Sequence, residues 1–338
     1  MKRFGKLFAV GLASITIVTG LTMGACGDNT PKDEVTVYMP DGAPALALAE
    51  LMAKDTQDDG ITYRVVDPST ITVKVAGKNP DDNADFCVLP VNAASLLLGS
   101  GEAYQMLGLV TQGNMYLISS NTEAAEIVDL SALAGETVGV MQIANVPGLT
   151  LKAALNRQNV AWRELKGGVT AAENEVNLQG VTGVDGSLKY YLAPEPMVSV
   201  LTASGKFRVV GDLQKLYNGA DSNQVGYPQA ALVAKRDFVS ENAAWTKKFV
   251  EDIAAAGAWL ETASAQEIYA AVSSHFEDEN HKASFAADKL GKETLARCGI
   301  SFAYSRDCYL RVDEFLEELT VVDSQKAKTV AKAFYWMP

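Results

Sequence analysis

A repeated alternation of short apolar strands and helices constrains the fold of this chain more than any other feature. Runs rich in valine, leucine and isoleucine, bounded by glycine and proline, predict strands, and a helical pattern follows several of them. The predicted strands are 35–39, 61–66, 86–89, 104–109, 115–119, 137–141, 190–193, 207–210 and 226–236, and the helices among them are 45–54, 93–98 and 149–158. This alternation is typical of an α/β architecture with largely parallel sheets. The stretch 70–76 fits either a strand, by its β-branched residues, or a crossover helix, by its place between two strands.

The C-terminal part of the chain has a different character. From residue 241 onward the apolar spacing predicts helices at 244–260, 265–274, 283–290 and 312–319. The chain has 338 residues, of which 48% are hydrophobic. That length and composition suffice for two domains with substantial cores.

The N-terminus predicts export and lipid attachment. Three positive charges in residues 1–6 precede an almost uniformly apolar run, 7–23, which is the layout of a signal peptide. The run ends in Met23-Gly24-Ala25-Cys26, which resembles the lipobox read by lipoprotein signal peptidase. We therefore expect residues 1–25 to be removed, Cys26 to be lipidated and 26–32 to form a tether to the cell membrane. The alternatives are an ordinary signal peptide and a short uncleaved anchor.

The charge of the chain argues against nucleic-acid binding. Residues 1–25 hold three of the 29 Lys and Arg residues, so the rest carries 26 basic against 41 acidic residues, a net charge of −15. Such a chain repels nucleic acid and anionic lipid surfaces. The acidic residues are spread along the sequence, which is typical of a solubilising surface.

Three cysteines remain besides Cys26. Cys87 lies in an apolar run and is expected to be a buried free thiol. Cys298 and Cys308 could close a disulfide outside the cytoplasm. Metal binding is the alternative, but the two histidines lie elsewhere in the sequence and six residues apart, a spacing that places them on different faces of a helix. No metal site and no cofactor are expected.

The order of several motifs resembles one family. The stretches are YMPDG (38–42), ADFCVLP (84–90), LAGETVGV (133–140) and GYPQAALV (226–233), with Pro-Glu-Pro at 194–196. They resemble extracytoplasmic solute-binding proteins of ABC importers, in the group that serves nitrate, sulfonates and thiamine precursors.

The resemblance implies a type II periplasmic-binding-protein fold. One lobe would hold residues 33–117 and 233–338 and the other residues 118–232, with a small solute bound in the cleft between them. Hinge closure would follow binding, and the partner would be the importer's permease. We expect the protein to act as a monomer.

The same layout predicts the ligand-binding loops, because the carboxyl ends of parallel strands and the helix N-termini behind them face the cleft. The candidates are Asp41, Gly42, Ala43, Asn92, Ala93, Gln112, Asn114, Tyr116, Ala144, Asn145, Gly148, Glu195 and Tyr227. Each also has a structural interpretation: Asp41 and Asn145 as helix caps, Gly42 and Gly148 as turn residues, Tyr116 as core. Glu195 fits either a ligand amine or an ion pair with a lysine. Since these loops hold few basic residues, a neutral or zwitterionic organic ligand fits better than a small inorganic anion.

Two other functions compete with transport. The same fold serves thiamine-pyrimidine synthesis, but the histidine and cysteine-rich segment of such enzymes are missing from this sequence, as are Ser-His-Asp, zinc and phosphate-loop motifs. We therefore expect a binding protein rather than an enzyme. A surface lipoprotein that senses a ligand or adheres, using the same fold without transport, is the second alternative.

Overall fold

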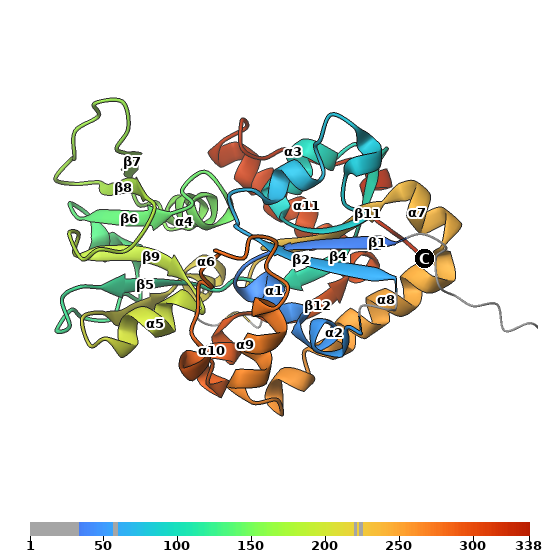
Figure 1. Ribbon diagram of the computed structural model, residues 1–338. Helices are drawn as coiled ribbons and strands as arrows, with labels where there is room; N and C mark the ends of the chain where they lie inside the picture. Colours follow the sequence, from blue (N-terminus) through green and yellow to red (C-terminus); the bar gives the residue numbers. More distant parts are fainter. Residues whose placement is uncertain (1–33, 57–59, 220–221, 223–225) are drawn as a thin grey trace, which may run out of the picture.

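Two six-stranded sheets form the framework of the protein. The computed structural model describes residues 34–56, 60–219, 222 and 226–338, and Figure 1 shows the sheets side by side as the cores of two lobes. The predicted signal peptide, Cys26 and the tether lie outside the described residues. No helix in the described part of the chain is long and apolar enough to cross a membrane.

The first lobe is built on a sheet with the strand order β12-β4-β11-β3-β1-β2. Its central strand β3 reads Phe-Cys-Val-Leu-Pro and is buried up to the last residue, as expected for a strand covered on both faces. Strands β2, β1 and β3 are parallel, β11 is antiparallel to β3 and β4, and β12 is antiparallel to β4. The strands are β1 (Val35–Pro40), β2 (Ile61–Val66), β3 (Phe86–Pro90), β4 (Tyr104–Thr111), β11 (Ala230–Lys235) and β12 (Ile300–Tyr304).

The second lobe is built on a sheet with the order β10-β5-β9-β6-β8-β7. Strands β7, β8, β6 and β9 are parallel, and β5 is antiparallel to β9 and β10. The elements are β5 (Met115–Ser119), β6 (Thr137–Met141), β7 (Trp162–Glu164), β8 (Val176–Val181), β9 (Tyr190–Pro194), β10 (Arg208–Asp212), and the helices α4 (Val146–Arg157), α5 (Met197–Ala203) and α6 (Leu213–Asn218).

The remaining helices belong to the first lobe, except the short 3₁₀ helix η3, which lies between β5 and β6 of the second. Two of its core clusters lie against the sheet, and the helices that follow β11 supply much of their apolar surface. Figure 1 shows these orange and red helices returning from the end of β11 to cover the blue N-terminal strands. The helices are α1 (Ala43–Ala47), α2 (Ala49–Lys54), α3 (Val91–Leu98), α7 (Arg236–Glu241), α8 (Ala243–Ala256), α9 (Ala265–Ser273), α10 (Lys292–Arg297) and α11 (Ser305–Val322); short 3₁₀ helices are η1 (Ile71–Lys74), η2 (Pro80–Asp82), η3 (Leu130–Leu133), η4 (Trp259–Glu261), η5 (Ala287–Lys289) and η6 (Lys332–Phe334).

The α/β architecture is confirmed, but several strands and helices differ from expectation, among them the unpredicted helices α6, α7 and α10. The strands β7, β8 and β12 were not predicted, because each is short or interrupted by polar or half-buried residues. The crossover at 70–76 is the 3₁₀ helix η1. The helix predicted at 283–290 is wrong: only η5 forms there, since Phe285 and Leu290 pack into the core from an irregular segment.

The chain crosses between the lobes at a point crowded with backbone. Because β5 belongs to the second sheet and β11 to the first, the crossings fall at 112–114 and 226–229, a few residues before the boundaries expected from the sequence. A third segment touches them where Gly299 leads into β12. A Cβ atom on Gly226 would lie 1.6 Å from the Gln112 carbonyl oxygen, and one on Gly299 would lie 1.9 Å from that of Gly113. Gly113, Gly226 and Gly299 all have positive φ, so only glycine fits these three positions without strain.

Cys298 and Cys308 are free thiols, so the disulfide considered from the sequence is not formed. The physical reason is the strand between them: Cys298 precedes β12 and packs in one core cluster, and Cys308 follows it and packs in the other. Cys87 is also free and buried, as expected. Burial raises the pKa of the Cys308 thiol to about 11 and also raises those of Cys87 and Cys298.

We expect Gly226→Ala to lower the free energy of unfolding by clearly more than Gly205→Ala. Both glycines have positive φ, which costs an alanine about 1–2 kcal/mol. Only at Gly226 does the added Cβ also strike backbone, whereas nothing lies within 4 Å of Gly205. Urea unfolding of the two variants measures the difference. Equal losses of stability would contradict the steric role given to the crossing.

A thiol titration tests the free cysteines. In a Cys26→Ser background without reductant, we expect the three thiols of Cys87, Cys298 and Cys308 to react with a disulfide reagent in denaturant. In the folded protein at pH 8 they should react slowly, because the raised pKa keeps them protonated. A single reactive thiol in denaturant would instead show that Cys298 and Cys308 are bonded.

Candidate ligand-binding cleft

A cavity of about 300 Å³ lies between the two lobes. The first lobe contributes η1, the first turns of α3 and the turn after α11, and the second lobe contributes the residues before α4. The lining residues are Thr72, Val73, Ala76, Asn92, Ala93, Leu96, Leu97, Ala144, Asn145, Gln325 and Lys326. Four of the residues predicted from the sequence are therefore brought together here: Asn92, Ala93, Ala144 and Asn145.

Two helix N-termini meet at this cavity. Helix α3 follows β3 directly and α4 follows a tight loop after β6, and in neither helix does the N-cap side chain bond the first turn. The loop before α4 packs closely against Gly148: a Cβ at this position would lie 2.1 Å from the Ile143 carbonyl oxygen. Glycine is therefore required here for close packing. Free N–H groups at such ends favour an anion or a carbonyl oxygen.

Asn92 lines the cavity and has a side-chain oxygen without a hydrogen-bond partner among the described residues. Its side chain is 1% exposed, and Nδ2 donates to the Lys326 carbonyl oxygen at 2.9 Å. Its Oδ1 is buried and has no hydrogen-bond partner. A buried acceptor without a partner is costly, which favours a donor supplied by something that enters the cavity.

Lys326 is a cavity residue that the sequence analysis missed. Helix α11 ends at Val322, and Asp323 turns the chain by accepting a hydrogen bond from the Gln325 backbone N–H at 2.9 Å. The turn brings Lys326 to the wall of the cavity, and none of the described residues lining it is acidic. Lys326 is exposed, and its charge and the two helix N-termini are the electropositive features of this part of an acidic protein.

Part of the cavity lining is apolar. Val73 of η1 and Leu97 of α3 line the cavity and are 62% and 46% exposed, and Leu96 lines it with them. Singly exposed apolar side chains are common on protein surfaces, but here two of them adjoin one concave surface.

Asp41, Gly42 and Ala43 lie at the end of β1 in a buried junction and do not line this cavity. Asp41 is 6% exposed; its Oδ2 accepts from the Ser284 backbone N–H at 2.7 Å and lies 3.0 Å from His281 Nε2. Its Oδ1 accepts from the Gly42 N–H at 2.7 Å. Asp41 therefore ties the irregular segment after α9 to the start of α1.

The other predicted residues gather at the crossing between lobes. Asn114 is buried; its Nδ2 donates to the Glu195 carbonyl oxygen at 2.7 Å and its Oδ1 accepts from Gln229 Nε2 at 2.5 Å. Gln112 and Tyr116 line a second cavity of about 260 Å³ beside the crossing. Tyr227 is fully buried and stacks on Phe315, and burial raises the pKa of its phenol.

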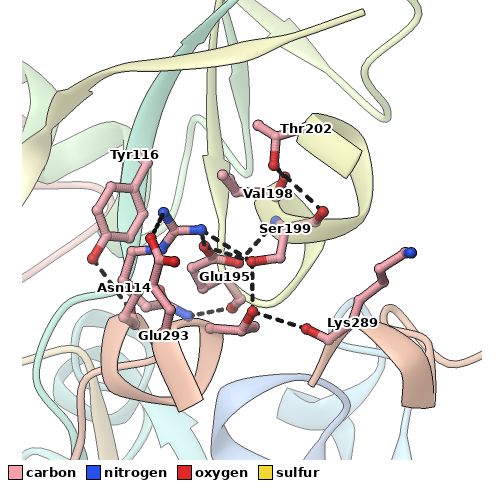
Figure 2. Close-up of polar contacts among 10 residues, drawn as sticks. Asn114, Tyr116, Glu195, Val198, Ser199, Thr202, Lys289 and Glu293 are labelled. Atoms are coloured by element: carbon pink, nitrogen blue, oxygen red, sulfur yellow. Dashed lines mark hydrogen bonds and ion pairs between the residues drawn. The ribbon is translucent and has the colours of Figure 1, made fainter. Parts of the chain in front are cut away.

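Glu195 is paired with an arginine. Its buried carboxylate accepts from the Ser199 backbone N–H at 3.0 Å and lies 2.5 Å from Arg297 Nη2. Figure 2 shows Glu195 and Ser199 on one side of this contact and the α10 segment, with Glu293, on the other. The sequence suggested a ligand amine or a lysine as partner; the cation in the structure is the guanidinium of Arg297.

Comparison with known proteins adds to this geometry. No protein-family model matches the sequence, and no curated protein matches it significantly. The structure of an ABC transporter protein from Parabacteroides distasonis is similar, with 17% identity and a TM-score of 0.66 over 90% of this chain and 98% of that one. The periplasmic aliphatic sulphonate-binding protein of Escherichia coli is 14% identical, with a TM-score of 0.63 over 90% of this chain and 92% of that one.

A third similar structure is the alkanesulfonate-binding protein of Xanthomonas axonopodis bound to MOPS. It is 12% identical, with a TM-score of 0.58 over 89% of this chain and 97% of that one. These likenesses show the fold: this chain has the two-lobed type II periplasmic-binding-protein architecture.

Proposed function

We propose that this protein captures a small organic solute between its lobes and delivers it to a membrane ABC importer. The observation that carries the proposal is the cavity lined by both lobes, because a ligand that contacts two lobes favours the closed arrangement of the pair. Its volume of about 300 Å³ suits a small molecule. The fold shared with solute-binding proteins of importers supports the same function.

The lining defines the chemistry of the solute. The N-termini of α3 and α4 and the charge of Lys326 would favour an anionic group of the solute. The unpartnered Oδ1 of Asn92 would accept a hydrogen bond from a donor group of the same solute, and Val73 and Leu97 offer only apolar surface. We infer a solute with an anionic group and a short apolar part; a zwitterion also fits if its ammonium lies away from these electropositive groups.

The rest of the assignment follows from the N-terminus. The lipobox at Cys26 would attach the protein to the outer surface of the cell membrane, where a tethered binder stays close to its permease. Export also agrees with the periplasmic proteins that share the fold.

Solute capture can be tested by thermal shift. We would use matched pairs of short-chain sulfonates or carboxylates and their neutral amides, and a solute at 100 times its Kd should stabilise the protein by about 2.7 kcal/mol. We expect the anions to raise the melting temperature and the amides to leave it unchanged. Lys326→Ala should weaken anion binding about tenfold, a loss of about 1.4 kcal/mol.

Lys328→Ala is the matched control for that variant, because Lys328 is exposed, two residues away, and does not line the cavity. It should bind like the wild type. If the amides bind as well as the anions, or if both lysine variants behave alike, the electropositive groups of the lining do not select the solute.

Membrane attachment has a separate test. We expect Cys26→Ala to abolish acylation and to release the protein from membranes in a fractionation assay. Lipid labelling of the wild type at Cys26 serves as the positive control. Membrane retention of the variant would show that residues 1–25 act as an uncleaved anchor.

A further inference from the structure

A cluster of polar side chains joins the two lobes on the side of α5 and α10. Glu195, Ser199 and Tyr116 come from the second lobe, and Thr294 and Arg297 come from the first; we call these five residues the latch. Figure 2 labels the three residues of the second lobe. None of them lines the cavity of about 300 Å³ between the lobes. The latch is therefore separate from the groups proposed to hold the solute.

The segment that carries Thr294 and Arg297 is fixed to the first lobe. Phe285 and Leu290 precede it and are buried in the core cluster under the first sheet, and Leu295 packs against the same cluster. Thr294 Oγ1 also donates to the Lys289 carbonyl oxygen at 2.8 Å. Arg297 thus moves with the first lobe, although its side chain reaches the second.

The contacts across the latch are short and converge on one carboxylate. The Glu195 side chain is fully buried and lies 2.5 Å from Arg297 Nη2, which also donates to Ser199 Oγ at 3.0 Å. Ser199 Oγ lies 2.8 Å from Thr294 Oγ1. The ring of Tyr116 faces the guanidinium, with 5.5 Å from its centroid to Cζ, and its hydroxyl lies 3.4 Å from the Arg297 carbonyl oxygen.

The opposite side of the lobe interface is mostly apolar. There α4 packs against α11, and one apolar cluster runs without a break from the second lobe into the first. Tyr227 stacks on Phe315 in this cluster, and Tyr217 meets the same ring edge-on. An ion pair also crosses this side, since Arg157 of α4 donates to both carboxylate oxygens of Glu318 in α11, but its side chains are partly exposed. Separation on that side would mainly expose apolar surface to water, whereas separation at the latch would expose groups that water can solvate.

We propose that the Glu195–Arg297 pair is an interlobe latch that stabilises the arrangement of the lobes described above, the closed form, and that the lobes separate by pivoting about the α4–α11 side. A buried ion pair gains Coulomb attraction but loses hydration, so its net stabilisation of the closed form is small. Because the net free energy of the pair is small, the contact can break and form again reversibly. Loss of one partner differs, because it leaves the other charge buried and unpaired in the closed form, which then opens to hydrate it.

The test measures the distance between lobes in the empty protein and so does not depend on solute capture. Spin labels at Lys206→Cys and Glu261→Cys, in a Cys26→Ser background, place one exposed reporter on each lobe; the remaining cysteines are buried. We expect one short distance in the parent protein. Arg297→Gln should reduce that population to a minority and add a longer distance.

Three further variants decide the outcome. Arg297→Lys keeps the charge and should retain the short distance. Arg163→Gln is the matched control, since it removes a bidentate pair with Glu175 inside the second lobe, and it should leave the distances unchanged. The double variant Glu195→Gln/Arg297→Gln has no buried charge and, because the net value of the pair is small, should keep most of the short distance. The contrast with Arg297→Gln shows whether an unpaired buried charge drives the opening.

Unchanged distances in a folded Arg297→Gln, or a double variant that opens as far as Arg297→Gln, would overturn the proposal. So would an equal opening in Arg163→Gln, because the effect would then come from general destabilisation. Circular dichroism of each variant shows that it is folded.

Discussion

The crossing between the lobes is the constraint on which the rest of the structure depends. Three backbone segments meet there at Gly113, Gly226 and Gly299, at distances that leave no room for a Cβ on the last two. Asn114 then joins the crossings, because its amide bonds both the Glu195 carbonyl oxygen and the Gln229 side chain. A junction packed at this density fixes where each sheet begins, and with it which strand ends face one another.

The cleft follows from that junction and from the direction of the strands. Strands β3 and β6 belong to different sheets, yet both end at the gap, and each is followed by a helix whose first turn faces it. The polarity of the two helices then sets the electrostatics without any charged side chain. Lys326, from the turn after α11, adds a full positive charge to the lining. None of the described residues that line the cavity is acidic.

The sequence predicts local structure and strand-end positions well, and it fails where a position depends on distant packing. Asn92 and Asn145 were predicted because a helix after a parallel strand must begin at the sheet edge. Lys326 reaches the cavity only because α11 packs against α4, which no local pattern records. Cys298 and Cys308 looked like a pair by spacing, but β12 lies between them. Asp41 sits at a strand end as expected, yet His281 and Ser284 occupy its carboxylate.

The two sides of the lobe interface differ in what they would lose on opening. On the α4–α11 side, each Å² of apolar surface exposed costs about 25 cal/mol, so even a modest separation is unfavourable. On the α5–α10 side, a neutral hydrogen bond exchanged with water costs only about 0.5–1.5 kcal/mol, and the net stabilisation by the buried Glu195–Arg297 pair is small because lost hydration offsets the attraction. A rigid-body opening of the lobes therefore separates the α5–α10 side, where less free energy is lost. The rotation axis then lies near the apolar α4–α11 side.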